Sequence, residues 1–467
     1  MILNERRINR LYSSYQDQRP KIGLSAFVLC AVILVSLSLN SPITFDEAFN
    51  WNFYRESTVF GVISDYSVSW NNQVPFTLLQ QLISPEMISS SPWFIRLFST
   101  SVGTVLVGLV IYQSTKVASR VFLPILLALG SPMIISYLFI ARSYSLTALL
   151  CTTSFLLTSR VTNSPRSKSV WLLSAVIPLA VAIWALPTVI YLVPGFLLFQ
   201  FLRRDFCEFL AQFLFLSLLI VASFASTFTK MIQLARNNPW SGSPSFFEYA
   251  NEFSFQWIFT SIAICLLLAP YITHSVRLTL QPYSVKKYVS SMSRQGFIAL
   301  STICTGLSYF ALTYFAYLIG MGWPFPRNAV APIWLVILGV SVLPPITAKR
   351  AKLIYPLLFV TASLGFSSLA SELNNGDWRR INPVLTETVP VAIRDLEQNG
   401  VSHIVCSSFD APVCILAIGL LQAQNISMQL GDNFIPDLPC VIGKQKPSPQ
   451  WQVRLYKSDQ LWGQLCH

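Results

Sequence analysis

The sequence predicts an all-α polytopic membrane protein with about eleven transmembrane helices, followed by a small extracytoplasmic α/β domain at the C-terminus. Hydrophobic residues make up 53% of the chain and charged residues only 11%, whereas charged residues are about 25% of ordinary soluble proteins. Apolar runs near membrane-spanning length recur from Ile22 to Ala370. The last hundred residues have a soluble composition and hold nine of the twenty acidic residues.

These runs divide the chain into a cytoplasmic tail (1–21), a transmembrane domain (22–370) and a soluble domain (371–467). The first run is a retained helix, because no small-residue cleavage site follows it. Pro178, Pro187 and Pro194 interrupt the fifth and sixth runs, which also fit one broken span. We expect helices near 22–40, 95–114, 121–138, 143–158, 170–185, 188–202, 207–229, 256–275, 296–319, 329–346 and 353–370.

The basic residues orient these helices. With a cytoplasmic N-terminus, nineteen basic residues fall in the inner segments and six in the outer loops before the tail, as the positive-inside rule requires. Merging the fifth and sixth helices places the later basic clusters outside, so eleven spans fit better than ten. The acidic residues show the opposite bias, with only four inside. The polar chemistry of the chain is therefore expected on its outer face.

The first outer loop (41–93) is the longest loop of the membrane part and begins with an acidic pair, Asp46-Glu47. Long loops in compact proteins tend to be functional. Segments 46–62 and 76–83 are predicted to form interfacial helices, since Trp and Tyr favour that depth. A solvated acid pair without a function fits the sequence equally well when the pair is considered alone.

Two arginines are expected at the same outer face. Arg142 lies in the tight turn between the third and fourth helices, and Arg327 precedes the tenth. Arginine near hydrocarbon usually has a partner or lines a polar cavity, although a side chain that reaches the outer headgroups is the simpler explanation. A guanidinium also binds phosphate through several fixed donors. The carboxylates and arginines together suit sugar transfer from a lipid-carried phosphate, with a carboxylate as base and arginines stabilising the departing phosphate.

At these residues the chain resembles the membrane glycosyltransferases of the GT-C fold, in particular the bacterial branch similar to protein O-mannosyltransferases and lipid A aminoarabinose transferases. The resemblance rests on the acidic pair followed by Ala48, the Ala-Arg-x-Tyr-x-Leu segment at 141–146, and an arginine before a late helix. It implies inverting transfer from a polyprenyl-phosphate sugar on the outer face to a glycan, lipid or protein acceptor. By position, Asp46 is the general base and Glu47 the second catalytic residue, which positions substrate or a divalent ion. The expected substrate contacts are Arg142, Tyr144, Arg327, Arg55, Asn72 and Gln73.

The chain departs from the family pattern at three places. Ile140 stands where many relatives carry an acidic residue, and Asn328 follows Arg327 where a tyrosine is usual. The sequence Asn71-Asn72-Gln73 replaces a segment in which many relatives have a histidine. These differences affect the phosphate and metal contacts more than the base.

The soluble domain is expected to contain helices at 382–398 and 411–422 and a strand at 402–406. Four of its residues are cysteines, and an extracytoplasmic location suits one or two disulfides among them. The other five cysteines lie in predicted spans and are interpreted as packing residues. The four in the soluble domain are Cys406, Cys414, Cys440 and Cys466.

Other functions remain alternatives at this stage. A transporter or flippase of lipid-linked sugars is less favoured, because the predicted spans carry few ionisable residues in their interiors. A glycan polymerase or ligase shares the chemistry, and a receptor-like protein is the fourth possibility. The net charge of +12 does not indicate nucleic acid, because the basic residues form short clusters between spans. No phosphate-binding loop or dinucleotide motif is present. We expect a bacterial inner-membrane location, with sugar and acceptor undetermined.

Overall fold

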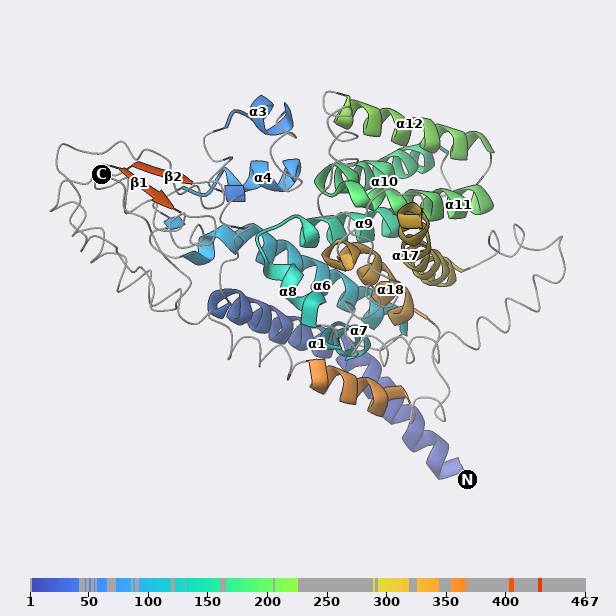
Figure 1. Cartoon of the computed structure of the whole chain (residues 1–467). Helices are drawn as coiled ribbons and strands as arrows, with labels where there is room; N and C mark the ends of the chain where they lie inside the picture. Colours follow the sequence, from blue (N-terminus) through green and yellow to red (C-terminus); the bar gives the residue numbers. More distant parts are fainter. Residues whose placement is uncertain are drawn as a thin grey trace, which may run out of the picture. The chain divides into compact units, whose positions relative to one another are not determined.

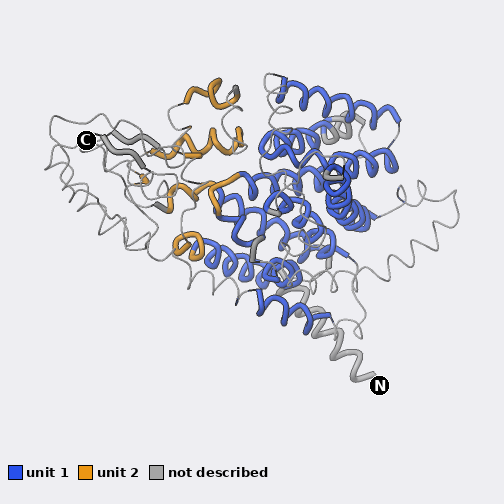
Figure 2. Tube along the Cα trace, in the orientation of Figure 1, with its two compact units in different colours: residues 1–35, 99–139, 143–369 blue, residues 36–98, 140–142, 370–467 orange. Residues whose placement is uncertain are grey.

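The structure of the 467-residue chain is a computed structural model (Figure 1). It describes residues 2–41, 47, 50–51, 54, 57–64, 73–84, 87–88, 92–118, 122–130, 132–159, 165–204, 206–225, 289, 293–318, 326–343, 354–365, 367, 403–406 and 427–430. Two compact units are present (Figure 2), and each is described by itself. Unit 1 comprises residues 1–35, 99–139 and 143–369, and unit 2 comprises 36–98, 140–142 and 370–467.

The described part of the chain is predominantly helical. Two long helices, α1 (Ile2–Asn40) and α6 (Leu97–Ala118), belong mostly to unit 1, and the 3₁₀ turn η1 (Pro92–Arg96) of unit 2 leads into α6. Unit 2 adds α3 (Val59–Ser64) and α4 (Val74–Gln80). The further elements of unit 1 are α7 (Phe122–Leu129), α8 (Pro132–Phe139), α9 (Tyr144–Thr158), α10 (Pro165–Ala185), η2 (Pro187–Leu192), α11 (Val193–Arg203), α12 (Phe206–Phe224), α17 (Arg294–Leu318), η3 (Pro326–Ala329), α18 (Val330–Ser341) and the helix Ile354–Gly365.

Helix length and composition indicate a membrane protein. Four described stretches are long and apolar enough to cross a bilayer: Pro20–Asn40, Trp93–Lys116, Phe206–Phe224 and Arg294–Ala316. Several shorter apolar helices accompany them. Large apolar side chains such as Leu29 on α1 and Leu218 on α12 are exposed, at 60% and 63%. Such surfaces suit contact with lipid chains.

The structure divides two segments that the sequence predicts as single helices. The predicted helix 121–138 is two short helices, α7 and α8, because the chain turns at Gly130 and restarts at Pro132, a residue that favours a first helical turn. The predicted loop helix 46–62 is interrupted at Ser57 and Thr58. The Thr58 hydroxyl accepts a hydrogen bond from the Gly61 amide at 3.0 Å, which starts α3 as a separate helix.

The fifth and sixth predicted helices are separate. Helix α10 continues through Pro178 and ends at Ala185, after which Leu186 is extended and Pro187 begins η2. A proline at this place lacks the amide that would continue α10. The segment 256–275, predicted as the eighth helix, lies outside the described residues.

Helices of unit 1 pack closely where small residues allow it. At Gly339 on α18, an added Cβ would lie 2.5 Å from Thr302 Oγ1 and 2.8 Å from the Ala299 carbonyl oxygen, both on α17. An added Cβ at Gly306 on α17 would likewise lie 2.6 Å from the Pro332 carbonyl oxygen on α18. Close approach through small residues is the usual means by which membrane helices associate.

Hydroxyl groups add hydrogen bonds between these helices. Ser99 Oγ donates to the Phe139 carbonyl oxygen at 2.7 Å, and Ser154 Oγ donates to the Ala175 carbonyl oxygen at 2.7 Å. Ser114 Oγ makes a longer bond of 3.4 Å to the Ser341 carbonyl oxygen. Because each serine donates to a carbonyl of another helix, packing of small residues and hydrogen bonding act together.

Of the predicted soluble domain, the structure describes two short strands of unit 2. Strands β1 (His403–Cys406) and β2 (Ser427–Leu430) pair in parallel, with His403 opposite Ser427 and Cys406 opposite Leu430. The first coincides with the predicted strand at 402–406. The predicted helices at 382–398 and 411–422, and Cys414, Cys440 and Cys466, lie outside the described residues.

Candidate active site

A buried face in the segment predicted to be the first outer loop forms the centre of the candidate site. Glu47, Asn50, Trp51 and Tyr54 have helical backbone and are each no more than 1% exposed. Their spacing of three, one and three residues places them on one side of a helix. The loop segment therefore packs its Glu47 inward, against other parts of unit 2.

Glu47 forms a buried ion pair with Arg96. Arg96 Nε donates to Glu47 Oε1 and Nη2 donates to Oε2, both at 2.8 Å, and neither side chain is exposed to solvent. This bidentate arrangement fixes the orientation of the carboxylate as well as its distance from the guanidinium. A charge in such surroundings is tolerable only because it has a well-placed partner.

Arg96 also binds the end of the first helix. Its Nη1 donates to the carbonyl oxygens of Ser38 at 3.1 Å and Ser41 at 2.9 Å. The last carbonyls of a helix lack intrahelical partners, and a cation there also opposes the helix dipole. Arg96 thus joins the end of α1, the start of α6 and Glu47.

A further hydrogen bond connects Glu47 to the turn that contains Arg142. The Ala141 amide donates to Glu47 Oε1, although the two residues are 94 positions apart in the sequence. The Ala141 carbonyl oxygen accepts from Gln80 Nε2 at 3.4 Å. Both backbone groups of Ala141 are therefore held by side chains, the amide by Glu47 and the carbonyl oxygen by Gln80.

Hydrogen bonds join the two helical segments of the predicted first outer loop. Asn50 Nδ2 donates to Gln80 Oε1, and to Thr77 Oγ1 at 3.2 Å. Trp51 Nε1 donates to the Ile83 carbonyl oxygen at 3.1 Å. Gln80 consequently lies between Asn50 and Ala141, and the position of α4 is coupled to that of the Arg142 turn. We call Glu47, Asn50, Gln80, Arg96 and Ala141 the polar cluster.

The predicted site residues fall in both units. In unit 2, Glu47 and Arg142 are buried, Arg142 at 2% exposure, and the Arg142 amide donates to the Ile140 carbonyl oxygen at 2.6 Å. Gln73 is buried at the N-cap of α4, where its carbonyl oxygen accepts from the amides of Phe76 and Thr77. Asp46, Arg55 and Asn72 lie outside the described residues.

Tyr144 and Arg327 belong to unit 1. Tyr144 is the first residue of α9, and its ring packs edge-on against Tyr137 at a centroid distance of 4.8 Å. Arg327 is half-buried in η3, where the next residue, Asn328, accepts a hydrogen bond from Tyr309 Oη at 3.3 Å. The structure thus connects Glu47 to the Arg142 turn, while Tyr144 and Arg327 are positioned by their own surroundings in unit 1.

The environment of Glu47 does not fit a divalent metal. Both of its oxygens accept from Arg96, one also accepts from the Ala141 amide, and a guanidinium at 2.8 Å repels a cation. Among the described residues, no group of three or more His, Cys, Asp or Glu side chains is arranged to hold a metal ion.

Arg96, Asn50 and Gln80 are site residues that the sequence does not single out. Arg96 stands at the start of a predicted helix and was one of six outer basic residues. Its position at the end of an apolar run could have identified it, because an arginine buried there needs a carboxylate partner and the predicted first outer loop contains one. Asn50 and Gln80 carry no comparable signal, since their contact depends on how α4 folds back.

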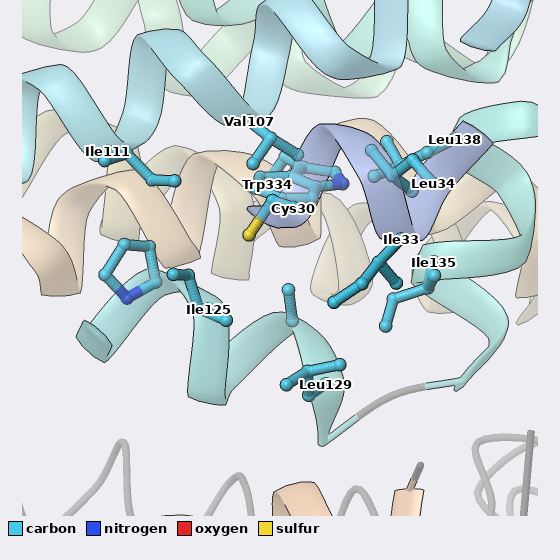
Figure 3. Close-up of a pocket in the computed structure, with 12 residues that line it drawn as sticks. Cys30, Ile33, Leu34, Val107, Ile111, Ile125, Leu129, Ile135, Leu138 and Trp334 are labelled. Carbon is cyan, nitrogen blue, oxygen red and sulfur yellow. The ribbon is translucent and has the colours of Figure 1, made fainter. Parts of the chain in front are cut away.

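A separate apolar cavity lies within unit 1 (Figure 3). It is lined by side chains from α1, α6, α7, α8 and α18, including Cys30, Leu34, Val107, Leu129 and Trp334. The lining is almost free of polar atoms. A cavity of this chemistry suits a hydrocarbon chain better than a sugar or an ion.

Comparison with known proteins gives no family assignment. No family model, no curated protein and no solved structure matches the chain.

Proposed function

We propose that the protein is a membrane glycosyltransferase that takes a sugar from a polyprenyl-phosphate donor and transfers it, with inversion, to an acceptor on the extracytoplasmic face. The observation that carries the proposal is the hydrogen bond from the Ala141 amide to Glu47. It joins Glu47 to the Ala-Arg-x-Tyr segment, and these residues belong to two of the three sequence features on which the resemblance to GT-C enzymes rests.

In this proposal the acidic pair has two separate roles. Glu47 is occupied by Arg96 and Ala141, so it acts as a positioning residue that holds the loop and the Arg142 turn together. Asp46, its neighbour in the chain, is the general base. The ion pair neutralises Glu47, which leaves Asp46 and Arg142 as the charges assigned to the reaction.

The reaction itself needs one base and a stabilised phosphate. The acceptor hydroxyl oxygen attacks the anomeric carbon while the bond from that carbon to the phosphate oxygen breaks. Polyprenyl phosphate leaves with the bonding electron pair, and the hydroxyl proton goes to Asp46. Arg142 binds the donor phosphate and stabilises the charge that grows on it. Arg327, Tyr144, Gln73, Asn72 and Arg55 are the further proposed substrate contacts.

The membrane setting supports a lipid-carried donor. The described helices include four that are long enough to span a bilayer, and the apolar cavity of unit 1 suits a hydrocarbon chain. The proposed topology has eleven spans, a cytoplasmic N-terminus, and the first outer loop and the C-terminal domain outside a bacterial inner membrane. The basic residues of the inner segments support this orientation.

The proposal is tested by supplying membranes that contain the full chain with radiolabelled undecaprenyl-phosphate hexoses and pentoses. Glycan product should form with at least one donor and should fall about 10²- to 10⁴-fold in the Asp46→Asn variant. Asp65→Asn, in the same predicted loop, is the matched control and should retain activity. Transport of the labelled lipid without product would contradict the proposal and favour a flippase.

A further inference from the structure

Three arginines of unit 1, none of them assigned to catalysis, gather at the ends of two helices. Arg203 ends α11, Arg204 follows it, and Arg294 begins α17. The pKa of Arg203 is lowered to about 10, mainly by burial and to a lesser extent by the positive charges of Arg204 and Arg294. Like charges destabilise one another, and a bound anion would offset this repulsion.

Two of the three arginines have a structural explanation. Arg204 Nη2 donates to the Thr158 carbonyl oxygen at 2.8 Å, and Arg294 Nε donates to Ser159 Oγ at 3.2 Å. Both bonds are at the C-terminal end of α9, where cations stabilise a helix. These contacts fix the two side chains without giving a role to Arg203.

Arg203 stacks on an aromatic ring. Its guanidinium carbon lies 3.9 Å from the centroid of the Phe297 ring, which belongs to a buried cluster with Phe199 and Val289. A guanidinium on an aromatic ring keeps its edge available for hydrogen bonds. Within the described residues, buried Nη1 of Arg203 has no hydrogen-bond partner.

Gln200 supplies a second, independent observation. It lies one helical turn before Arg203 and is 0% exposed. Neither Nε2 nor Oε1 of the Gln200 side chain has a hydrogen-bond partner among the parts of the chain that the structure describes. A buried primary amide without partners is costly. A bound group with oxygen atoms would accept from the Gln200 amide and from Arg203.

The surrounding surface favours a membrane lipid as the source of this oxygen-bearing group. Phe201 on α11 and Phe206, Leu210 and Phe213 on α12 are exposed apolar side chains near the same helix ends. Exposed aromatic and aliphatic side chains next to basic groups are typical of a membrane interface, where a lipid phosphate lies above its own acyl chains. The basic residues of this end are also those predicted to face the cytoplasm.

We propose that Gln200 and Arg203, flanked by Arg204 and Arg294, bind the phosphate of an anionic phospholipid in the cytoplasmic leaflet. This site does not depend on the transferase activity, because none of its residues is assigned to the reaction. Its ligand is a membrane lipid that stays bound, rather than a donor or an acceptor.

The test uses the purified full chain in detergent, titrated with phosphatidylglycerol, and measures retained lipid by native mass spectrometry. One phosphatidylglycerol should bind more tightly than phosphatidylcholine. Arg203→Gln should weaken this binding about fivefold, as expected for one arginine at an anionic surface. Lys116→Gln, which removes an exposed basic side chain from the end of α6, is the matched control and should bind as the original chain does.

Two further measurements keep the proposal falsifiable. Gln200→Leu retains every arginine and should also weaken binding, whereas unchanged binding in both Arg203→Gln and Gln200→Leu would overturn the site. If Arg203→Gln does not fold, Arg203→Lys replaces it and should lose affinity despite its charge. Inorganic phosphate should compete poorly. Equal binding of inorganic phosphate, without a preference for phosphatidylglycerol, would overturn the assignment to a lipid.

Discussion

The polar cluster of unit 2 and the contact between α17 and α18 in unit 1 are held together in opposite ways. In the polar cluster, Glu47 and Arg96 form a fully buried ion pair, and a hydrogen bond joins the side chains of Asn50 and Gln80. Between α17 and α18, glycines bring the backbones together and apolar side chains fill the space. Hydrogen bonds in the polar cluster fix the orientation of its side chains, whereas the glycines fix the distance between the α17 and α18 backbones. A reaction needs defined directions, and for this reason the proposed function is assigned to residues held by the polar cluster.

The largest effect is expected from breaking the buried ion pair. Arg96→Met should lower the free energy of unfolding by about 3–5 kcal/mol, because Glu47 keeps a buried charge without its partner. Unfolding in mixed detergent, followed by far-UV circular dichroism, measures this change. The double variant Glu47→Gln with Arg96→Met should regain part of the loss, and Lys116→Met serves as an exposed control. Equal stability of Arg96→Met and Lys116→Met would show that the pair does not hold unit 2.

Closing the glycine contact should have the next largest effect. Gly339→Ala places a methyl group about 2.5 Å from Thr302 Oγ1 and 2.8 Å from a backbone oxygen, and such overpacking costs about 1–3 kcal/mol. Gly23→Ala is the matched variant, since its Cβ meets Thr115 Oγ1 at 3.2 Å. Thermal unfolding should separate the two variants. If both have the same Tm, close packing does not limit the α17–α18 contact.

A smaller effect on stability, accompanied by an effect on activity, is expected at Gln80. Gln80→Leu removes the bridge between Asn50 and the Ala141 carbonyl oxygen, and unsatisfied buried polar groups cost about 1–3 kcal/mol. Product formation per folded protein should also fall, because the Arg142 turn loses one of its two supports. The half-buried Gln113 on α6 provides the control Gln113→Leu. Loss of stability with unchanged turnover would separate the polar cluster from the reaction.

The smallest effect is expected from the hydroxyl bonds of unit 1. Ser114→Ala removes a bond of 3.4 Å to the Ser341 carbonyl oxygen, and side-chain hydrogen bonds between membrane helices contribute about 0.6 kcal/mol on average. Ser99→Ala, which removes a bond of 2.7 Å, should cost more than Ser114→Ala. Tm values measured side by side rank the two. A larger loss for Ser114→Ala would mean that bond length does not order these contacts.

The sequence predicts what depends on local pattern. Apolar runs and prolines are local, so the helix starts at Tyr144 and Phe206 and the break before Pro187 are predicted closely. The turn at Gly130 was missed because the apolar run continues through it, and hydropathy does not register a change of direction. The long helix α1 also extends through the polar segment predicted as a tail.

The sequence predicts less about the candidate site, because the site is made by distant contacts. The acidic pair and Arg142 were identified from charge near an apolar boundary. The partner of Glu47 was not, since nothing local distinguishes Arg96 from the other outer basic residues. The hydrogen bond between Ala141 and Glu47 is donated by a backbone amide, so the identity of residue 141 gives no indication of it.

The division of labour between Asp46 and Glu47 is the central claim, and turnover per folded protein in the two isosteric variants tests it most directly. Asp46→Asn should keep the Tm of the original chain and lose product formation about 10²- to 10⁴-fold. Glu47→Gln should lower the Tm, because Arg96 then keeps an unneutralised buried charge. Full turnover in a well-folded Asp46→Asn protein would contradict the claim.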